Sequence, residues 1–321
     1  MKTPLNLLCF TAIILSTQPF GRAAGLLVSY SSIKGGGIEK YSLTPQTTGT
    51  IFDQETVAVN SLTVANNTAY WASGGTQIYS DSLNDATGGA AKTALPSLPF
   101  GGVTISDLAV DPATNQYLVG WIAPGYGWFI VQYPLSPPGN FSIFVNATTT
   151  IQGLTIAGNK AYWIEGINVW SQNLDGTGKS QVQNFSFGGV ELNDLAVDSA
   201  SQTYFLAAAT NGLPPLIARY PLTPNANGNL FTFATNNIPA VTLAGDRAYW
   251  IDGQGVYSKR LDGTDFTLQE TLPNGLTPTD LAVSLDAPVS APEPATSTAL
   301  GGGLILFAML LRNRRLRKAE R

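Results

Sequence analysis

The 321-residue chain contains no histidine, and its only cysteine, Cys9, lies within the first ten residues. Without histidine there is no Ser-His-Asp or Cys-His nucleophile and no His-ligated zinc or iron site. Without a second cysteine there is no intramolecular disulfide. The composition therefore excludes the commonest hydrolase and metalloenzyme chemistries, and an exported form of the chain would be held together by its core alone.

Charge is also scarce, because Asp, Glu, Lys and Arg make up only 12% of the residues. Residues 24–291 contain 9 Lys and Arg against 19 Asp and Glu, a net charge of −10, whereas six of the 17 basic residues lie in the last ten positions. An acidic domain argues against nucleic acid and anionic lipid as partners. It is compatible with soluble partners, neutral glycans or bound cations.

The N-terminal residues 1–23 have the order of a signal peptide. Lys2 precedes a short apolar stretch from Leu5 to Leu15, and the small residue Ala23 stands before the expected cleavage site. The alternative is an uncleaved anchor, for which the stretch is short. We therefore expect export of the chain.

The C-terminal residues 287–321 form a linker and tail. Pro292, Glu293 and Pro294 are followed by the uncharged stretch 295–311 and then by an Arg-rich end. This stretch is just long enough for a membrane helix whose basic flank stays cytoplasmic. The order closely resembles the PEP-CTERM sorting signal, which implies an exosortase-type processing enzyme, a transient membrane anchor and a Gram-negative host that makes exopolysaccharide. The alternative is an ordinary C-terminal anchor.

Between these ends the sequence repeats itself. Three segments ending in Tyr-Trp align without gaps at Trp71, Trp163 and Trp250, and three Asp-Leu-Ala-Val segments lie between them. One apolar residue of each segment gives a series with steps of 40–46 residues: Val64, Val110, Ile156, Val197, Leu243 and Val283. A period of about 40–45 residues is typical of a four-stranded propeller blade.

The repeat predicts an all-β domain over residues 24–286, a six-bladed β-propeller with four strands per blade. The blades are expected at residues 26–57, 58–100, 103–148, 150–188, 191–237 and 239–274. The chain begins with a segment like a second strand, at Leu26, and ends with one like a first strand, at Asp280. We therefore expect the C-terminal strand to complete the first blade and close the ring.

The repeated pieces Asp-Leu-Ala-Val-Asp, Ala-Tyr-Trp-Ile-Glu/Asp and Leu-Asp-Gly-Thr resemble the YWTD propeller of the LDL-receptor class B repeats. The match is good in blades 2, 4 and 6 and partial in the others. Ala72, Ile164 and Ile251 stand where that family has threonine, and Ser73 replaces the acid in blade 2. The resemblance implies the fold and no particular ligand.

Five acidic residues are candidates for a cation site at the mouth of the channel. Asp107, Asp194 and Asp280 begin first strands in alternate blades, and Glu165 and Asp252 end second strands, so all five are expected on one face. Carboxylates in that arrangement could bind Ca²⁺. The alternative is that each aspartate accepts hydrogen bonds from backbone N–H groups of its own loop.

The segment from Trp121 to Trp128 connects the second and third strands of blade 3 and carries Tyr126 between two glycines. An exposed aromatic ring on such a tip could stack on a sugar. The alternative is a surface residue without a role, while Trp121 and Trp128 are expected to pack in the interior.

These features favour a non-enzymatic, surface-sorted binding module for an envelope or matrix protein or polysaccharide, with no cofactor or with calcium. A second hypothesis is a calcium-dependent hydrolase or lactonase that uses the channel carboxylates, by analogy of fold alone. A third is a structural spacer without a ligand.

Overall fold

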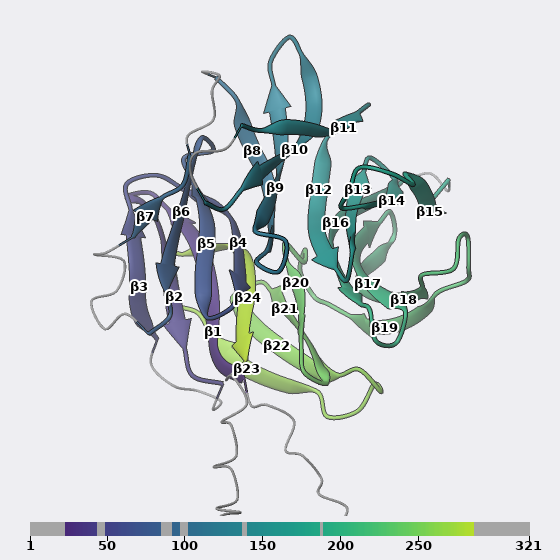
Figure 1. Cartoon of the computed structure of the whole chain (residues 1–321). Coiled ribbons are helices and arrows are strands. Elements are labelled where there is room, and N and C mark those ends of the chain that lie inside the picture. The colour runs from purple at the N-terminus through teal and green to yellow at the C-terminus, as the bar shows by residue number, and fades with distance from the viewer. Residues whose placement is uncertain are drawn as a thin grey trace, which may run out of the picture. The chain divides into compact units, whose positions relative to one another are not determined.

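A computed structural model describes residues 23–43, 49–84, 92–96, 102–136, 140–186 and 189–285. All of these residues belong to one compact unit. The first unit contains six antiparallel sheets of four strands each (Figure 1). The predicted all-β six-bladed propeller is confirmed.

In blades 2 to 6 the strands follow chain order from the inside of the blade to the outside, whereas the innermost strand of blade 1 is the last one in the chain. Blade 1 comprises β24 (Thr277–Leu285), β1 (Ala23–Ser32), β2 (Gly35–Tyr41) and β3 (Thr50–Glu55). Blade 3 comprises β8 (Thr104–Asp111), β9 (Gln116–Ala123), β10 (Gly127–Pro134) and β11 (Ser142–Ala147). Blade 5 comprises β16 (Val190–Asp198), β17 (Thr203–Thr210), β18 (Leu213–Pro221) and β19 (Asn229–Phe233). Blade 2 comprises β4 (Val59–Ala65), β5 (Thr68–Ser73), β6 (Gln77–Ser82) and β7 (Thr93–Ala94). Blade 4 comprises β12 (Ile151–Ala157), β13 (Lys160–Glu165), β14 (Asn168–Asn173) and β15 (Ser180–Asn184). Blade 6 comprises β20 (Val241–Ala244), β21 (Arg247–Asp252), β22 (Gly255–Arg260) and β23 (Thr267–Thr271).

The six innermost strands form a closed cycle. Each contacts the next in the order β24, β4, β8, β12, β16, β20 and back to β24. The repeated apolar positions lie on these strands, from Val64 on β4 to Val283 on β24. Because every blade presents two apolar faces, this radial stacking is the arrangement that covers both of them.

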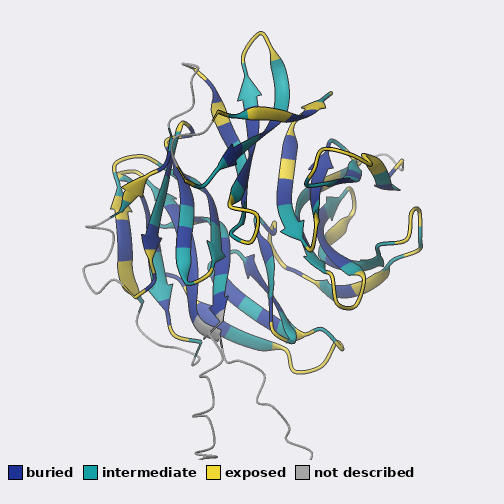
Figure 2. Ribbon diagram, viewed as in Figure 1, coloured by how far each residue is buried: buried dark blue, intermediate teal, exposed yellow. Residues whose placement is uncertain are grey.

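The core of the propeller is divided among the blade interfaces. Six buried clusters each combine residues of two neighbouring blades, and the buried positions follow the inner and middle strands (Figure 2). Trp71, Trp163 and Trp250 are almost wholly buried, and they fill the interfaces of blades 1 and 2, 3 and 4, and 5 and 6. The repeated tryptophans therefore mark three equivalent interfaces, as their spacing predicts.

Blade 1 joins the two ends of the domain. β1 pairs with β24 from Ala23 opposite Leu285 to Ser31 opposite Thr277, and β2 and β3 follow outward. The C-terminal strand thus completes the first blade, as the sequence predicts. β24 thereby covers the inner edge of β1, which would otherwise be unpaired.

Both predicted targeting segments lie outside the described residues, apart from Ala23, and so do Pro292, Glu293 and Pro294. The described ranges consist of strands and turns, and none of them contains a helix long and apolar enough to cross a bilayer.

Candidate functional site

The three repeated aspartates lie within the inner strands. Asp107, Asp194 and Asp280 each follow a β-bulge in β8, β16 and β24, several residues after the strand begins. The sequence predicted them at strand starts; the strands begin earlier because their first residues also pair with the second strand. All three belong to odd-numbered blades and keep part of their surface accessible.

Each aspartate bridges its own blade to the following one. One carboxylate oxygen accepts the backbone N–H of the next residue, at 2.7 Å in all three cases. The other oxygen accepts a backbone N–H from the first strand of the next blade: Leu62 at 2.6 Å for Asp280, Val241 at 2.7 Å for Asp194, and Leu154 for Asp107. These bonds join blades 1 and 2, 3 and 4, and 5 and 6.

Asp107 makes one contact more than its two equivalents. Its Oδ1 atom also accepts the hydroxyl of Ser61 in blade 2, at 2.8 Å. Asp107 therefore links three successive blades through one carboxylate.

The three carboxylates influence one another electrostatically. Loss of hydration raises the pKa of Asp107 to about 6, against the hydrogen bonds from Leu154, Leu108 and Ser61 that lower it. Loss of hydration, followed by repulsion from Asp107, raises the pKa of Asp280 to about 8. Loss of hydration and the charges of Asp280 and Asp107 raise the pKa of Asp194 well above its ordinary value. The pKa values of all three aspartates are therefore raised above that of an isolated aspartate.

This geometry matches the structural role considered for the aspartates, with the difference that half of the backbone N–H donors come from the following blade. Among the residues that the structure describes, no three Asp, Glu, His or Cys side chains are grouped so that they could hold a metal ion. The cation-binding role of Asp107, Asp194 and Asp280 stays a prediction.

Glu165 and Asp252 end β13 and β21, as the sequence predicts, and both fasten a loop. Glu165 is buried and accepts the backbone N–H and the hydroxyl of Thr148, at 2.6 and 2.7 Å. Asp252 accepts the backbone N–H groups of Thr235 and Asn236, at 2.8 and 2.7 Å. Their carboxylates therefore secure the chain that enters blades 4 and 6.

Blade 2 has serine at this position, and a different acid contacts its tryptophan. Glu55 of β3 accepts the indole N–H of Trp71 at 3.0 Å, and Lys92 contacts Glu55 at 2.8 Å and Asp53 at 3.2 Å. In blade 4, Lys179 lies 3.7 Å from Glu165 and faces the Trp163 ring. The sequence repeat did not reveal the Asp53–Glu55–Lys92 cluster, because its carboxylates lie on the preceding blade.

Burial, followed by the hydrogen bond with Glu55, raises the pKa of Asp53 to about 6. Burial acts on Glu55 in the same direction, but the bonds from Lys92 and Trp71 outweigh it and lower the pKa of Glu55. The ammonium group of Lys92 is thus the counter-charge for two adjacent carboxylates.

We expect Lys92→Met to destabilise the propeller by about 1–3 kcal/mol, since it leaves two buried carboxylates without this partner. The lysine is 25% exposed, which keeps the loss below that of a fully buried pair. Urea unfolding measures the change, with Lys34→Met on the exposed β1–β2 turn as the control. Equal unfolding midpoints for the two variants would show that the cluster adds no stability.

Tyr126 lies at the tip of the β9–β10 hairpin of blade 3. Its side chain is 85% exposed, as the sequence predicts for the tip. Gly125 and Gly127 on either side have φ angles of 82° and 111°, in the region that favours glycine. The amide of Tyr126 donates to the carbonyl of Ala123 at 3.0 Å, so the tip is an ordered turn.

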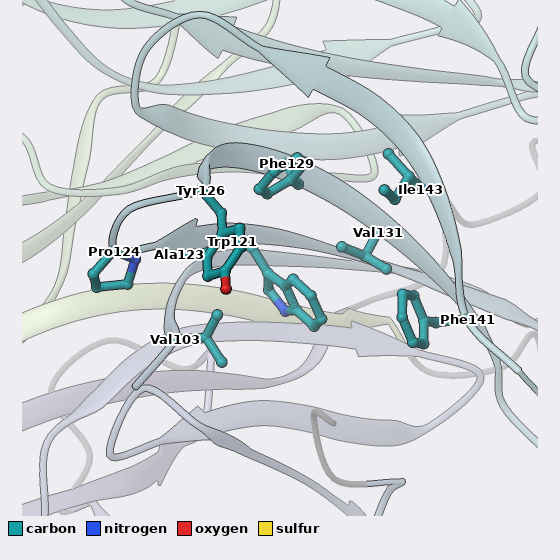
Figure 3. Close-up of a pocket in the computed structure, with 9 residues that line it drawn as sticks. All are labelled: Val103, Trp121, Ala123, Pro124, Tyr126, Phe129, Val131, Phe141 and Ile143. Atoms are coloured by element: carbon teal, nitrogen blue, oxygen red, sulfur yellow. The ribbon is translucent and has the colours of Figure 1, made fainter. Parts of the chain in front are cut away.

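A cavity of about 350 Å³ opens beside Tyr126. Figure 3 shows the Trp121 indole between the Tyr126 ring on one side and the Phe141 ring on the other. Its lining is apolar and aromatic and contains no charged side chain: Val103, Trp121, Ala123, Pro124, Tyr126, Phe129, Val131, Phe141 and Ile143. This pocket, called the blade 3 pocket below, was not foreseen from the sequence.

The pocket lies on the face of blade 3 that packs against blade 2. Trp121 and Val131 belong to the same buried cluster as Ala72 and Ile78 of blade 2. The outer strand β7 of blade 2 has only two residues, whereas the other outer strands have five or six. The pocket therefore lies where blade 3 faces blade 2, whose outer strand is short.

Three solved structures have folds similar to that of this chain, and two of them are described as TolB or putative TolB. A chain of the crystal structure of a nidogen/laminin complex matches with a TM-score of 0.65 at 16% identity, covering 81% of this chain and 99% of that chain. TolB from Acinetobacter baumannii matches with a TM-score of 0.65 at 12% identity, covering 84% of this chain and 69% of that one. A TolB from Agrobacterium tumefaciens, itself described as putative, matches with a TM-score of 0.57 at 12% identity, covering 79% and 91%.

At these identities the likeness concerns the fold alone. No model of a protein family matches the chain. No curated protein matches it either.

Proposed function

We propose that this chain is an exported, surface-sorted protein whose propeller is a binding module for a partner in the envelope or extracellular matrix. The blade 3 pocket carries this proposal, because an open apolar cavity with an exposed aromatic residue at its mouth is typical of ligand and partner sites. The signal-peptide and sorting-tail patterns of the sequence support the address. The likeness to TolB structures agrees with the fold of the module.

The chemistry of the pocket favours a protein over a polysaccharide as the partner there. A sugar would bring several hydroxyl groups against walls that offer few hydrogen-bonding groups, and burying them without partners is costly. An apolar or aromatic side chain of a partner protein would fill the same space without that cost. Tyr126 would cover it from the solvent side, as an aromatic anchor does at many protein interfaces.

We expect Tyr126→Ala to weaken partner binding about five- to thirtyfold, which corresponds to the loss of about 1–2 kcal/mol when an interface aromatic is truncated. The test immobilises the full chain and measures its binding to separated envelope protein and envelope polysaccharide fractions. A parallel titration with indole tests the pocket directly, and Tyr126→Ala is expected to weaken indole binding as well.

Leu213→Ala is the matched control, because Leu213 lies on the equivalent hairpin of blade 5 and is 60% exposed. It is expected to bind like the unaltered chain. Equal binding by Tyr126→Ala and Leu213→Ala would exclude the blade 3 pocket as the site. If the immobilised chain bound the polysaccharide fraction and not the protein fraction, the partner would be a polysaccharide and not a protein.

A further inference from the structure

A second cavity lies at the interface of blades 5 and 6, and its character is opposite to that of the blade 3 pocket. It has a volume of about 410 Å³ and is lined by residues of β17, β18, β19, β22 and the turn after β22. Arg219 and Lys259 both line it, one from each blade. It is called the blade 5–6 cleft below.

The two basic side chains are fixed by backbone carbonyls. The Nη1 atom of Arg219 donates to the carbonyl of Leu261 at 3.0 Å, and the Nζ atom of Lys259 donates to the carbonyl of Phe231 at 2.8 Å. Lys259 also lies over the Phe231 ring, 5.0 Å from its centre. A guanidinium has five N–H donors and an ammonium has three, so both groups keep capacity for a ligand.

The threefold repeat supplies an internal comparison for this pair. The position of Arg219 is occupied by Lys40 in blade 1 and by Gln132 in blade 3, and both side chains donate to the equivalent leucine carbonyl of the next blade, at 2.8 and 3.2 Å. The position of Lys259 is occupied by Asp81 in blade 2 and by Gln172 in blade 4.

The three interfaces therefore carry different charges at one and the same place. Blades 1 and 2 combine a cation with an acid, blades 3 and 4 combine two neutral amides, and blades 5 and 6 combine two cations. Since glutamines satisfy the same bonding pattern, packing does not require the two positive charges of Arg219 and Lys259. Two like charges in one cleft repel each other unless an anion lies between them.

We propose that the blade 5–6 cleft binds the carboxylate-bearing sugar unit of an acidic polysaccharide. The planar fork of Arg219 matches a carboxylate, and Lys259 adds a point charge. Tyr220, Leu230 and Phe231 also line the cleft and offer apolar surface to the face of a sugar ring. Asn229 and Asp262 line it as well and can exchange hydrogen bonds with hydroxyl groups.

This combination of basic, polar and aromatic groups distinguishes a sugar acid from an inorganic anion or a plain acidic peptide. The volume is that of a small-molecule site. The cleft and the blade 3 pocket lie on different blades and differ in chemistry, so the proposal stands whether or not the blade 3 pocket binds a protein. Failure of one binding test leaves the other informative.

The test titrates the full chain with methyl β-D-glucuronide, with methyl β-D-glucoside as the neutral match, and with inorganic phosphate. We expect the glucuronide to bind at least tenfold more tightly than the glucoside. The double variant Arg219→Gln/Lys259→Gln, which reproduces the neutral pair of blades 3 and 4, is expected to weaken glucuronide binding at least tenfold. Lys40→Gln makes a similar charge change at blades 1 and 2 and should leave the affinity within twofold.

Arg219→Lys provides a second variant that keeps the charge but loses the fork, and it is expected to weaken glucuronide binding several-fold. Equal affinity for the glucuronide and the glucoside would overturn the proposal, and so would unchanged affinity in the double variant. If phosphate bound as tightly as the glucuronide, the cleft would be a general anion site, and the proposed sugar-acid site would be wrong.

Discussion

The propeller is expected to unfold at a higher temperature at pH 4–5 than at pH 8. Burial raises the pKa of Asp107 to about 6 and that of Asp280 to about 8, and it raises the pKa of Asp194 as well. A carboxyl group whose pKa is higher in the folded chain stabilises the fold below its unfolded pKa, and the stability is lost as the pH rises through the folded value. For Asp107 alone the difference between pH 4 and pH 8 is about 2 kcal/mol.

The measurement is the midpoint of thermal unfolding across this pH range, and a shift of several degrees is expected for a domain of this size. Asp107→Asn removes one titrating group and should flatten part of the profile. It also costs about 1–3 kcal/mol, since an asparagine oxygen cannot serve all the donors that now meet the carboxylate.

Asp175 provides a control of opposite sign. Hydrogen bonds from Thr177 lower the pKa of this exposed carboxyl, so its contribution is lost as the pH falls. Asp175→Asn is therefore expected to leave the rise in stability on acidification intact. An unfolding midpoint that stays constant, or that falls from pH 8 to pH 5, would contradict the raised pKa values of Asp107, Asp194 and Asp280.

Replacing Trp163 by alanine is expected to lower the free energy of unfolding by about 3–5 kcal/mol. The indole is wholly buried between blades 3 and 4, where it packs with Leu118, Ile130 and Phe144. Its removal leaves a cavity between two rigid sheets that cannot close around it, and it also removes the ring that Lys179 faces. Denaturant unfolding with an unchanged dependence on denaturant concentration would show that the loss is one of stability.

Tyr126→Ala is the comparison for this variant, because it truncates an aromatic side chain that is 85% exposed. It is expected to change the free energy of unfolding by no more than about 0.5 kcal/mol. Similar losses for both variants would mean that the tip of the β9–β10 hairpin supports the fold, and binding defects of Tyr126→Ala would then need another explanation.

The architecture could be predicted because the blades of a propeller have similar lengths, so equivalent residues recur in the sequence at a regular spacing. Val64 and its five equivalents recur at the length of a blade, and the matches at Leu26 and Asp280 reveal how the ring closes. What the period cannot show is the partner of a side chain on another blade. The donors to Asp107, Asp194 and Asp280 include amides in the following blade, so burial and proton binding become visible only in three dimensions.

The candidate sites likewise combine features that the local sequence predicts with features that depend on contacts between blades. The exposure of Tyr126 followed from the two glycines beside it, but the blade 3 pocket is formed by side chains of several strands and loops that the repeat does not bring together in the sequence. Arg219 stands in a recognisable repeat, yet its position beside Lys259 depends on how blade 6 packs on blade 5. Local geometry was therefore predictable, whereas the charge and shape of each cavity depended on contacts between blades.

The pairing of β1 with β24 has a consequence for the order in which the domain can form. These strands adjoin in space but are separated by about 250 residues of chain, so the first blade stays incomplete until the last segment has been synthesised and delivered. Until then the hairpin of β1 and β2 presents an open edge to other chains, which invites aggregation. Under the export proposed above, the chain would cross the membrane unfolded and complete its first blade only when β24 has followed the rest of the domain.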